Sequence, residues 1–228
     1  MGKYTGGATA LTRATHPRTG QQIYVPDDYE FFKQAERGKL TRAEEWLDAY
    51  RHWGSGTRVL EAYAGAGLLT VIYLNHGYTP LAIEQKPGLV KALRKNVRRY
   101  HVGRGTPECV LADNMSVLPQ LPTNARGMRV IDLDSYGSCV PQIDEAARIL
   151  SKGLLLVTSG EILTLCRFRR TDFIEKRYGF GFDGSWREFH ERVVYRYVKQ
   201  AFAKHDKKTE LVDAFVWPTI CRLCIKVG

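Results

Sequence analysis

The stretch that most constrains the fold is VLEAYAGAGLLT, at residues 59–70. Val59 and Leu60 belong to a short apolar run of the kind that forms a strand buried on both faces. Small residues at 62–67 follow, where a strand would turn sharply, and an apolar helical segment begins at Leu68. A strand, a glycine turn and a helix in this order let a ligand contact bare backbone at a helix N-terminus.

The residues around the two glycines predict which ligand binds there. Gly65 and Gly67 match the dinucleotide fingerprint G-x-G-x-x-G, but Thr70 stands where its third glycine belongs. Glu61 precedes the glycines, and a carboxylate at this place suits a cationic amine or sulfonium better than an anionic pyrophosphate. S-adenosyl-L-methionine carries both cations, so it is the favoured cofactor, and a nicotinamide enzyme is a distant alternative.

The charge of the chain indicates its partner. The sequence has 34 Lys and Arg against 24 Asp and Glu, a formal net charge of +10. This surplus favours a polyanionic partner, nucleic acid first, with simple solubility as the competing explanation. No apolar run reaches the roughly 18 residues of a membrane span, and the N-terminus lacks the apolar core of a signal peptide. We therefore expect a cytoplasmic protein without a membrane partner.

The five cysteines, Cys109, Cys139, Cys166, Cys221 and Cys224, are scattered along the chain. The last two form a C-x-x-C pattern, but they lie in an apolar run typical of a strand, where residues three apart face opposite ways. We expect reduced, mostly buried thiols of an intracellular protein, and no metal site.

The rest of the chain alternates predicted strands and helices. Residues 1–26 are predicted as an irregular arm, 27–37 as a short helix, and 41–53 as a helix begun by the capping box of Thr41 and Glu44. After the strand that ends near 60, further strands are predicted at 78–83, 109–112, 130–133, 153–158, 210–216 and 219–227, and helices at 88–100, 144–150 and 186–203. This order predicts an α/β Rossmann-like fold with a mixed, mostly parallel seven-stranded sheet, helices on both faces and one antiparallel strand at the end. We assign 1–56 to an N-terminal arm with helices and 57–228 to one catalytic domain.

Polar residues at two strand ends extend the predicted cofactor site. Glu84 ends the second strand, where a carboxylate accepts hydrogen bonds from both hydroxyls of a ribose. Asp113 and Asn114 follow the third strand, and Asp113 is placed to accept from the exocyclic amine of an adenine. Met115 would be an apolar neighbour of the adenine ring.

The fourth strand leads into DLDSYGSCVP at 132–141. Asp132 and Asp134 are two residues apart, so a strand through both points their side chains the same way. Tyr136 follows them. Burying two carboxylates in the core at the carboxyl end of a central strand would cost free energy. Together with an aromatic ring, they are more typical of a binding or catalytic site.

Two clusters of basic residues are candidates for contact with phosphates. Arg167, Arg169 and Arg170 lie in a predicted loop after the fifth strand, where guanidinium groups could clamp phosphates. The stretch between Glu84 and Glu108 has seven basic residues and no acid, and its helix is either a solvated face or a phosphate-contacting surface.

Taken together, VLEAYAGAGLLT, AIEQ, LADN and DLDSYGS resemble the motifs of class I S-adenosylmethionine-dependent methyltransferases. The stretch 131–166 is similar to the catalytic domain of tRNA (guanine-26-N2) dimethyltransferases, whose motif runs D-x-D-P-[FY]-G-S. The resemblance covers about residues 57–228. The sequence departs from it at Ser135 and Cys139, where that family has prolines, and it shows no counterpart of the family's N-terminal N-R-D motif or additional C-terminal domain.

The resemblance implies methyl transfer to an exocyclic amine of a nucleic-acid base, with guanine N2 in tRNA or other RNA as the expected acceptor. Asp134 is the expected catalytic carboxylate that accepts N–H bonds from the attacking amine. Asp132 supports it or contacts the cofactor, and Tyr136 stacks on an extruded base. The predicted cofactor contacts are Glu61, Tyr63, Gly65, Gly67, Glu84, Gln85, Asp113, Asn114 and Asp132.

Two other functions compete with RNA methylation. In a DNA amino methyltransferase, D-S-Y-G would take the place of the usual [DNS]-P-P-[YFW] motif. In a non-catalytic nucleic-acid-binding protein the fold would remain without turnover, which Ser135 favours. RNA is preferred to DNA as the partner.

Overall fold

A computed structural model describes residues 10–27, 33–50, 57–102, 105–135, 137–168 and 170–228 of the chain. The chain divides into two compact units, Met1–Val117 (the first unit) and Leu118–Gly228 (the second unit). The division of 1–56 from 57–228 stays a prediction.

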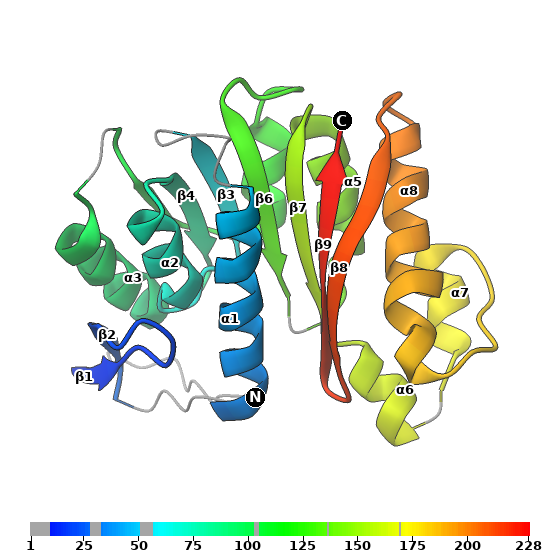
Figure 1. The fold of residues 1–228 in the computed structure, drawn as a ribbon, viewed down its shortest axis with the longest axis horizontal. Helices are drawn as coiled ribbons and strands as arrows, with labels where there is room; N and C mark the ends of the chain where they lie inside the picture. Colours follow the sequence, from blue (N-terminus) through cyan, green and yellow to red (C-terminus); the bar gives the residue numbers. More distant parts are fainter. Residues whose placement is uncertain (1–9, 28–32, 51–56, 103–104, 136, 169) are drawn as a thin grey trace. The chain divides into compact units, whose positions relative to one another are not determined.

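The first unit contains a hairpin, three parallel strands and the helices between them (Figure 1). Its elements are β1 (Leu11–Thr15), β2 (Gln22–Pro26), α1 (Lys33–Ala49), β3 (Arg58–Ala62), α2 (Leu68–Asn75), β4 (Thr79–Glu84), α3 (Pro87–Tyr100), β5 (Glu108–Leu111) and α4 (Asn114–Val117).

The parallel strands of the first unit lie in the order β5-β4-β3. Every residue of β4 is buried, as expected for a central strand covered on both faces. On α3, Leu93 and Val97 pack in one apolar cluster with Leu74 of α2 and Ala82 of β4. This packing brings the carboxyl ends of the three strands, and the polar residues that follow them, to one edge of the sheet.

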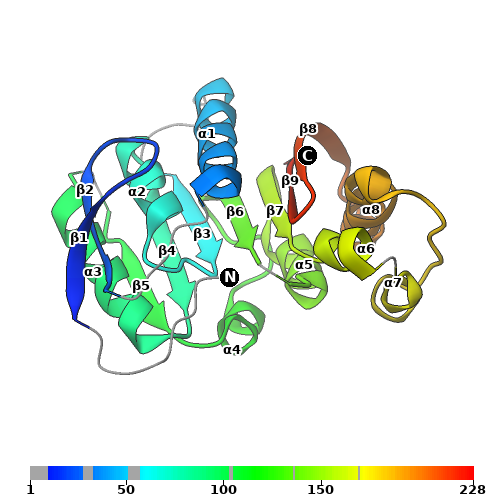
Figure 2. The same ribbon diagram turned by 90° about the horizontal axis from the view of Figure 1, so that it is seen from below.

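The prediction of an irregular arm is wrong for residues 10–26, which form the antiparallel hairpin of β1 and β2. Ile23 and Val25 are buried on one side of β2, and the strand packs against α3. The hydroxyl of Tyr100 donates a 2.5 Å hydrogen bond to the carbonyl of Gln22. Figures 1 and 2 show the hairpin beside α3. Two alternating apolar residues are too weak a strand signal to stand out, and the hairpin forms because α3 covers them.

The prediction of two helices around Thr41 is also wrong, because α1 runs through this residue without a break. Leu40, Ala43 and Leu47 are fully buried at helical spacing, so one apolar stripe continues across the predicted N-cap. Residues 51–53, the predicted end of this helix, and 28–32 lie outside the described residues.

The second unit contains four strands with helices between and beside them. Its elements are η2 (Leu118–Gln120), β6 (Met128–Asp134), α5 (Val140–Ile149), β7 (Gly153–Ser159), α6 (Ile162–Phe168), α7 (Asp172–Tyr178), η3 (Trp186–Glu188), η4 (His190–Tyr195), α8 (Arg196–Ala203), β8 (Thr209–Trp217) and β9 (Ile220–Val227).

The strands of the second unit lie in the order β6-β7-β9-β8 (Figure 1). β6 and β7 are parallel, and β9 is the antiparallel strand expected at the chain's end, inserted between β7 and β8. The register pairs Asp134 with Thr158, Thr158 with Arg222, and Arg222 with Phe215. Directly paired residues point to the same face of a sheet, so these four side chains form one row across it.

Two helical segments of the second unit differ from the prediction. A loop was expected around Arg167, but the chain forms α6 there. Residues 186–203 form a 3-10 turn, a π-helix and α8 in place of one regular helix. A π turn rotates the face that follows it, so Phe202 is fully buried while Tyr197, expected to face inward, is half-buried.

All five cysteines are free thiols. Burial raises the pKa of both Cys221 and Cys224 to about 12, which keeps these thiols protonated and unreactive. No helix among the described residues is long and apolar enough to cross a membrane.

Candidate functional site

The glycine turn after β3 has the strained backbone that its sequence predicts. Tyr63, Gly65 and Gly67 have φ values of 67°, 57° and 90°, in the left-handed region that favours glycine. A Cβ at Gly67 would lie 2.8 Å from Cδ1 of Leu93, so a side chain there would also require Leu93 to move. A Cβ at Gly65 would meet nothing within 4 Å, so the turn is open on that side. Tyr63, which is not a glycine, adopts this conformation at a cost typical of functional sites.

Glu84 is held beside this turn by backbone groups. Its Oε2 accepts from the N–H of Gly65 at 2.9 Å, and its Oε1 accepts from the N–H of Lys86 at 2.9 Å. The residue is only 7% exposed. Each oxygen keeps a further lone pair, so this carboxylate can still accept from a pair of hydroxyls. Gln85, the next residue, is exposed at the same strand end.

Glu61 and Thr70 form a buried pair at the same edge. The hydroxyl of Thr70 donates to Oε2 of Glu61 at 2.5 Å. Thr70 stands in place of the third fingerprint glycine, so the departure that argued against a dinucleotide has a structural role here. It orients a carboxylate just before the turn.

Asp113 and Asn114 follow β5 at this edge. Oδ1 of Asp113 accepts from the N–H of Met115 at 2.8 Å, so Asp113 begins the short helix α4. Among the described residues, Oδ1 of Asn114 is buried without a hydrogen-bond partner. A buried acceptor costs free energy unless something donates to it, so this oxygen points to a ligand donor at the edge.

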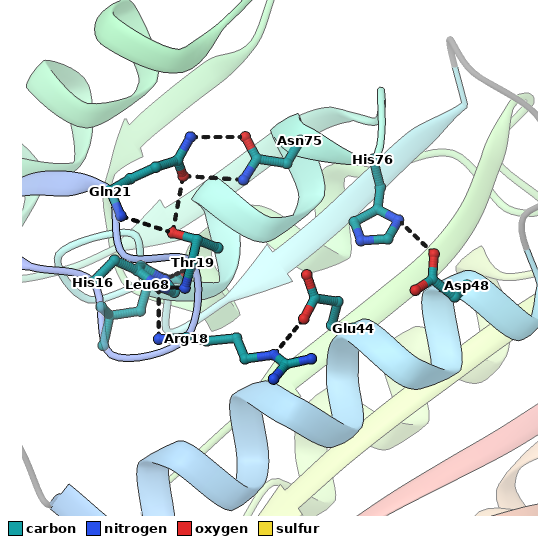
Figure 3. Close-up of polar contacts among 9 residues, drawn as sticks. All are labelled: His16, Arg18, Thr19, Gln21, Glu44, Asp48, Leu68, Asn75 and His76. Carbon is teal, nitrogen blue, oxygen red and sulfur yellow. Dashed lines mark hydrogen bonds and ion pairs between the residues drawn. The ribbon is translucent and has the colours of Figure 1, made fainter.

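The sequence analysis missed two residues that hold the glycine turn. The first is His16, in the β1–β2 turn, whose side chain is 1% exposed (Figure 3). Its Nδ1 accepts from the N–H groups of Arg18 and Thr19 at 3.2 and 3.0 Å, which places the ring proton on Nε2. Nε2 then donates to the carbonyl of Leu68 at 3.0 Å, at the start of α2. Burial holds the pKa of His16 below its ordinary value, and the ring is neutral.

The second missed residue is Asn96 of α3, which is fully buried. Its Nδ2 donates to the carbonyl of Ala66 at 2.9 Å and to that of Tyr24 at 2.8 Å. Its Oδ1 accepts from the N–H of Tyr24 at 2.7 Å. The hairpin therefore bonds Leu68 directly through His16, and it is linked to Ala66 through Asn96, so these bonds reach both sides of Gly67. No local pattern could reveal this, since His16 and Leu68 are 52 residues apart.

Further contacts fasten the hairpin turn to the neighbouring helices. Gln21 and Asn75 exchange two amide hydrogen bonds, of 3.3 and 3.0 Å (Figure 3). Arg18 forms an ion pair with Glu44 of α1. The turn that carries His16 is thus anchored on α1 and α2.

In the second unit, Asp132 is a fully buried carboxylate bound to a fully buried guanidinium. Nη1 and Nη2 of Arg222 donate to its two oxygens at 3.0 and 2.8 Å, and Nη1 also donates to Oγ1 of Thr158 at 2.7 Å. A bidentate pair of this kind fixes both side chains. Asp132 thus lies behind the edge of the sheet, in a supporting position.

Asp134 lies two residues after Asp132, at the carboxyl end of β6. It is 8% exposed, and Nη1 of Arg222 is 3.7 Å from its Oδ1. Asp132 and Asp134 share one face, as predicted, with Arg222 between them. Asp134 thus ends β6 with a cation close to its carboxylate.

Ser135, the residue that departs from the D-x-D-P-[FY]-G-S pattern, shapes the turn after β6. Its Oγ accepts from the N–H of Gly137 at 3.0 Å and donates to the carbonyl of Ser138 at 3.3 Å. A serine can therefore order this turn where a proline would otherwise restrict it. Tyr136, the predicted stacking residue, lies outside the described residues.

The predicted phosphate clamp is divided between α6 and the link that leads to α7. Arg167 is exposed in the last turn of α6, and Arg169 lies outside the described residues. Arg170 donates to both oxygens of Asp172, at 3.0 and 2.7 Å. This acid neutralises one of the three predicted cations. In the part of the chain that the structure describes, no three His, Cys, Asp or Glu side chains gather as a metal site.

A buried acid that the sequence analysis left without a role lies after β7. Glu161 is 4% exposed and accepts from Arg177 and from the hydroxyl of Tyr178. Burial and this acid raise the pKa of Tyr178 well above its ordinary value. The arrangement fastens α7 to the start of α6.

Comparison with known proteins supplies the family. The model of the family described as N2,N2-dimethylguanosine tRNA methyltransferase matches residues 23–227. The tRNA (guanine(26)-N(2))-dimethyltransferase, mitochondrial, of Saccharomyces cerevisiae is 27% identical over 176 residues, which are 74% of this chain and 31% of the yeast protein. The chain therefore spans about a third of the length of this curated relative.

Solved structures show the fold. Trm1 from Pyrococcus horikoshii, in complex with S-adenosyl-L-methionine, matches 96% of this chain and 61% of its own, with a TM-score of 0.72 and 17% identity. TYW2 of the same organism, in complex with MeSAdo, matches 97% of this chain and 72% of its own, with a TM-score of 0.66 and 15% identity. The prediction of a Rossmann-like class I methyltransferase fold is confirmed.

Proposed function

Because the chain belongs to the N2,N2-dimethylguanosine tRNA methyltransferase family, we propose that it is an S-adenosylmethionine-dependent methyltransferase acting on guanine N2 in tRNA. The observation that carries the proposal is the geometry of Glu84, whose two oxygens accept backbone N–H groups of Gly65 and Lys86. These bonds would position the Glu84 carboxylate, beside the open glycine turn, to accept hydrogen bonds from a ribose.

The residues of the first unit fit the proposed cofactor. Glu84 would accept from the ribose hydroxyls, and Glu61 suits a cationic group near the turn. Asn114 offers a buried acceptor that has no hydrogen-bond partner among the described residues, and Asp113 lies beside it. When bound, S-adenosylmethionine supplies an electrophilic methyl group on a sulfonium. Tyr63 and Gln85 remain predicted contacts.

The residues of the second unit fit the proposed acceptor. An exocyclic amine of guanine is a weak nucleophile because its lone pair is delocalised into the ring. Asp134 would accept an N–H bond from this amine and stabilise the positive charge that develops on it. Arg222, held by its two hydrogen bonds to Asp132, lies beside Asp134. Tyr136 stays the predicted stacking residue for the base.

A transfer assay tests the proposal against its two competitors. The protein is incubated with methyl-labelled S-adenosylmethionine and either total tRNA or duplex DNA. We expect label in tRNA. Label in DNA alone would favour the DNA amino methyltransferase, and label in neither, with cofactor still bound, would favour the non-catalytic protein. The cytoplasmic location also stays a proposal, since the yeast relative is described as mitochondrial.

Replacing Glu84 by Ala is expected to weaken binding of S-adenosylmethionine at least 10- to 100-fold, because even one hydrogen bond to a charged group contributes about 1.5–3 kcal/mol. The measurement is titration calorimetry, together with the rise in melting temperature that a ligand of the native state produces. Glu108→Ala is the matched control, since Glu108 is an exposed glutamate of the same unit. NAD should shift neither protein. A shift with NAD alone would overturn the choice of cofactor.

Two substitutions of His16 separate its two hydrogen-bonding nitrogens. A glutamine nitrogen occupies the place of Nε2 and can still donate to Leu68, whereas an asparagine oxygen occupies the place of Nδ1 and can still accept from Arg18 and Thr19. We expect His16→Gln to keep most of the cofactor affinity and His16→Asn to lose about tenfold, the typical value of one buried bond. Equal affinity in both variants would show that the bond to Leu68 does not position the glycine turn.

The lowered pKa of His16 also predicts a dependence on pH. The unfolded chain binds a proton near the ordinary histidine pKa of about 6.5, while the folded protein resists protonation. The unfolded state therefore gains protons first, and the free energy of unfolding falls as the pH drops below about 6.5. Thermal melts between pH 8 and pH 5 should show a smaller fall for His16→Gln than for the wild type.

A further inference from the structure

The outer side of the β1–β2 hairpin gathers cations around one aromatic ring. We call Arg13, Tyr24, Lys95 and Arg99 the Tyr24 face. Lys95 places its Nζ 3.9 Å from the centre of the Tyr24 ring, and the guanidinium groups of Arg13 and Arg99 lie 5.8 and 6.0 Å from it. Arg13 is the cross-strand partner of Tyr24, while the other two cations come from α3. The three cations are exposed, and Tyr24 is partly exposed.

These three cations differ from many others on the protein in the partners that they have. In the described part of the chain, none of Arg13, Lys95 and Arg99 forms a salt bridge. Elsewhere, Arg170, Arg177 and Arg192 pair with acids, as do Arg18, Arg42, Arg58, Arg148 and Lys226. The sequence has no acid at 1–26 and none between Glu84 and Glu108. Three cations therefore share this face in two stretches of sequence that contain no acid, and such a grouping favours a polyanionic partner.

The ring at the centre of the face has a fixed backbone. Both the N–H and the carbonyl of Tyr24 are bonded to the buried amide of Asn96, at 2.7 and 2.8 Å. Hydrogen bonding from Arg13 and the charge of Lys95 lower the pKa of Tyr24, consistent with a positive potential at its hydroxyl. A rigid aromatic surface ringed by cations loses little conformational entropy on binding a ligand.

We propose that the Tyr24 face binds the sugar-phosphate backbone of the RNA substrate, with its cations on phosphates and the Tyr24 ring against a ribose or an unpaired base. The inference rests on the proposed function and names a contact surface for its partner. A polyanion matches three cations that form no salt bridge with any described residue, and the partly exposed ring gives RNA a stacking contact that an acidic peptide would use less well.

The test is anisotropy of labelled tRNA over a series of salt concentrations. Replacing Arg13, Lys95 and Arg99 together by Gln should lower the slope of log affinity against log salt by about 2 to 3, since each lost phosphate contact contributes about 0.7–0.9. The matched control replaces Arg196, Lys199 and Lys204, three exposed cations on or next to α8, in the same way. An equal fall in both triple variants would overturn the proposal, because net charge alone would then explain it.

A substitution of Tyr24 tests the proposed contact between its ring and a ribose or base. Tyr24→Leu keeps the backbone bonds to Asn96 and removes the aromatic surface, and it should weaken tRNA binding about fivefold or more with little change in the salt slope. Unchanged affinity would remove the ring from the proposal. Polyglutamate at equal charge should compete poorly; competition as strong as that of unlabelled tRNA would mean that the face binds any polyanion.

The outcome is separable from that of the proposed function. All these variants should bind S-adenosylmethionine as the wild type does, because Glu84 and the glycine turn are unchanged. If the protein methylates tRNA while the triple variant binds tRNA as tightly as the wild type, this inference alone fails. If the wild type neither binds nor methylates tRNA, the proposed function fails with it.

Discussion

Replacing Asp134 by Asn is expected to lower the turnover number about 100- to 1,000-fold, the cost of removing one preorganised electrostatic contact, roughly 3 kcal/mol. The side chain keeps its shape and one carbonyl acceptor, so a residual rate should remain. Its charge is lost, and with it the stabilisation of an amine that becomes positive as it attacks. Asp134 is 8% exposed beside Arg222, where a charge acts through little water.

Two measurements assign this effect to the chemical step. Affinity for S-adenosylmethionine, measured by calorimetry, should change far less than turnover does. Asp183→Asn is the matched control, because Asp183 is an exposed acid of the same unit. If Asp134→Asn instead strongly weakens cofactor binding while turnover at saturating cofactor is preserved, then Asp134 is a cofactor contact, and the catalytic role passes to another group.

Replacing Arg222 by Met should lower the free energy of unfolding by about 3–5 kcal/mol, because the charge of Asp132 would stay buried without its cation. Both side chains are fully buried, and their two hydrogen bonds measure 3.0 and 2.8 Å. Urea denaturation measures the loss. Lys226→Met on the same strand, where Lys226 forms a surface pair with Glu210, should have a small effect.

The double variant Arg222→Met with Asp132→Leu closes the cycle. Replacing both partners of a buried ion pair by apolar residues is often neutral or stabilising. We therefore expect the double variant to be more stable than Arg222→Met alone. Additive losses would mean that the two residues act independently, and that Arg222 is not the group that fixes Asp132.

The parts that the sequence predicted are those where one local pattern decides the structure. β4 contains the apolar run of Leu81, Ala82 and Ile83 because both its faces are buried, and α3 has a clear apolar stripe. Glu84 could be placed at a strand end because parallel strands deliver their carboxyl ends to one edge. The left-handed conformation of Gly65 and Gly67 likewise follows from glycine itself.

The parts that escaped prediction depend on residues far apart in the chain. The hairpin of 10–26 is ordered by α3 and by bonds such as that from His16 to Leu68. The capping box at Thr41 does not start a helix, because the buried apolar stripe of α1 continues through this residue. Asp132 gave no sign that a cation 90 residues later, Arg222, would bind both its oxygens. The position of Arg222 in the apolar run of β9 was itself a signal, because a buried arginine needs a buried acid as its partner.

The proposed function is methylation of the exocyclic amine of guanine in tRNA, and the proposed role of Asp134 is to assist the attack. The most direct test is mass spectrometry of nucleosides from tRNA that has been incubated with S-adenosylmethionine and either the wild type or Asp134→Asn. We predict N2-methylated guanosine with the wild type and about 1% or less of that amount with the variant at equal, early times. Methyl groups on adenosine or cytidine, or equal yields from both proteins, would contradict the account.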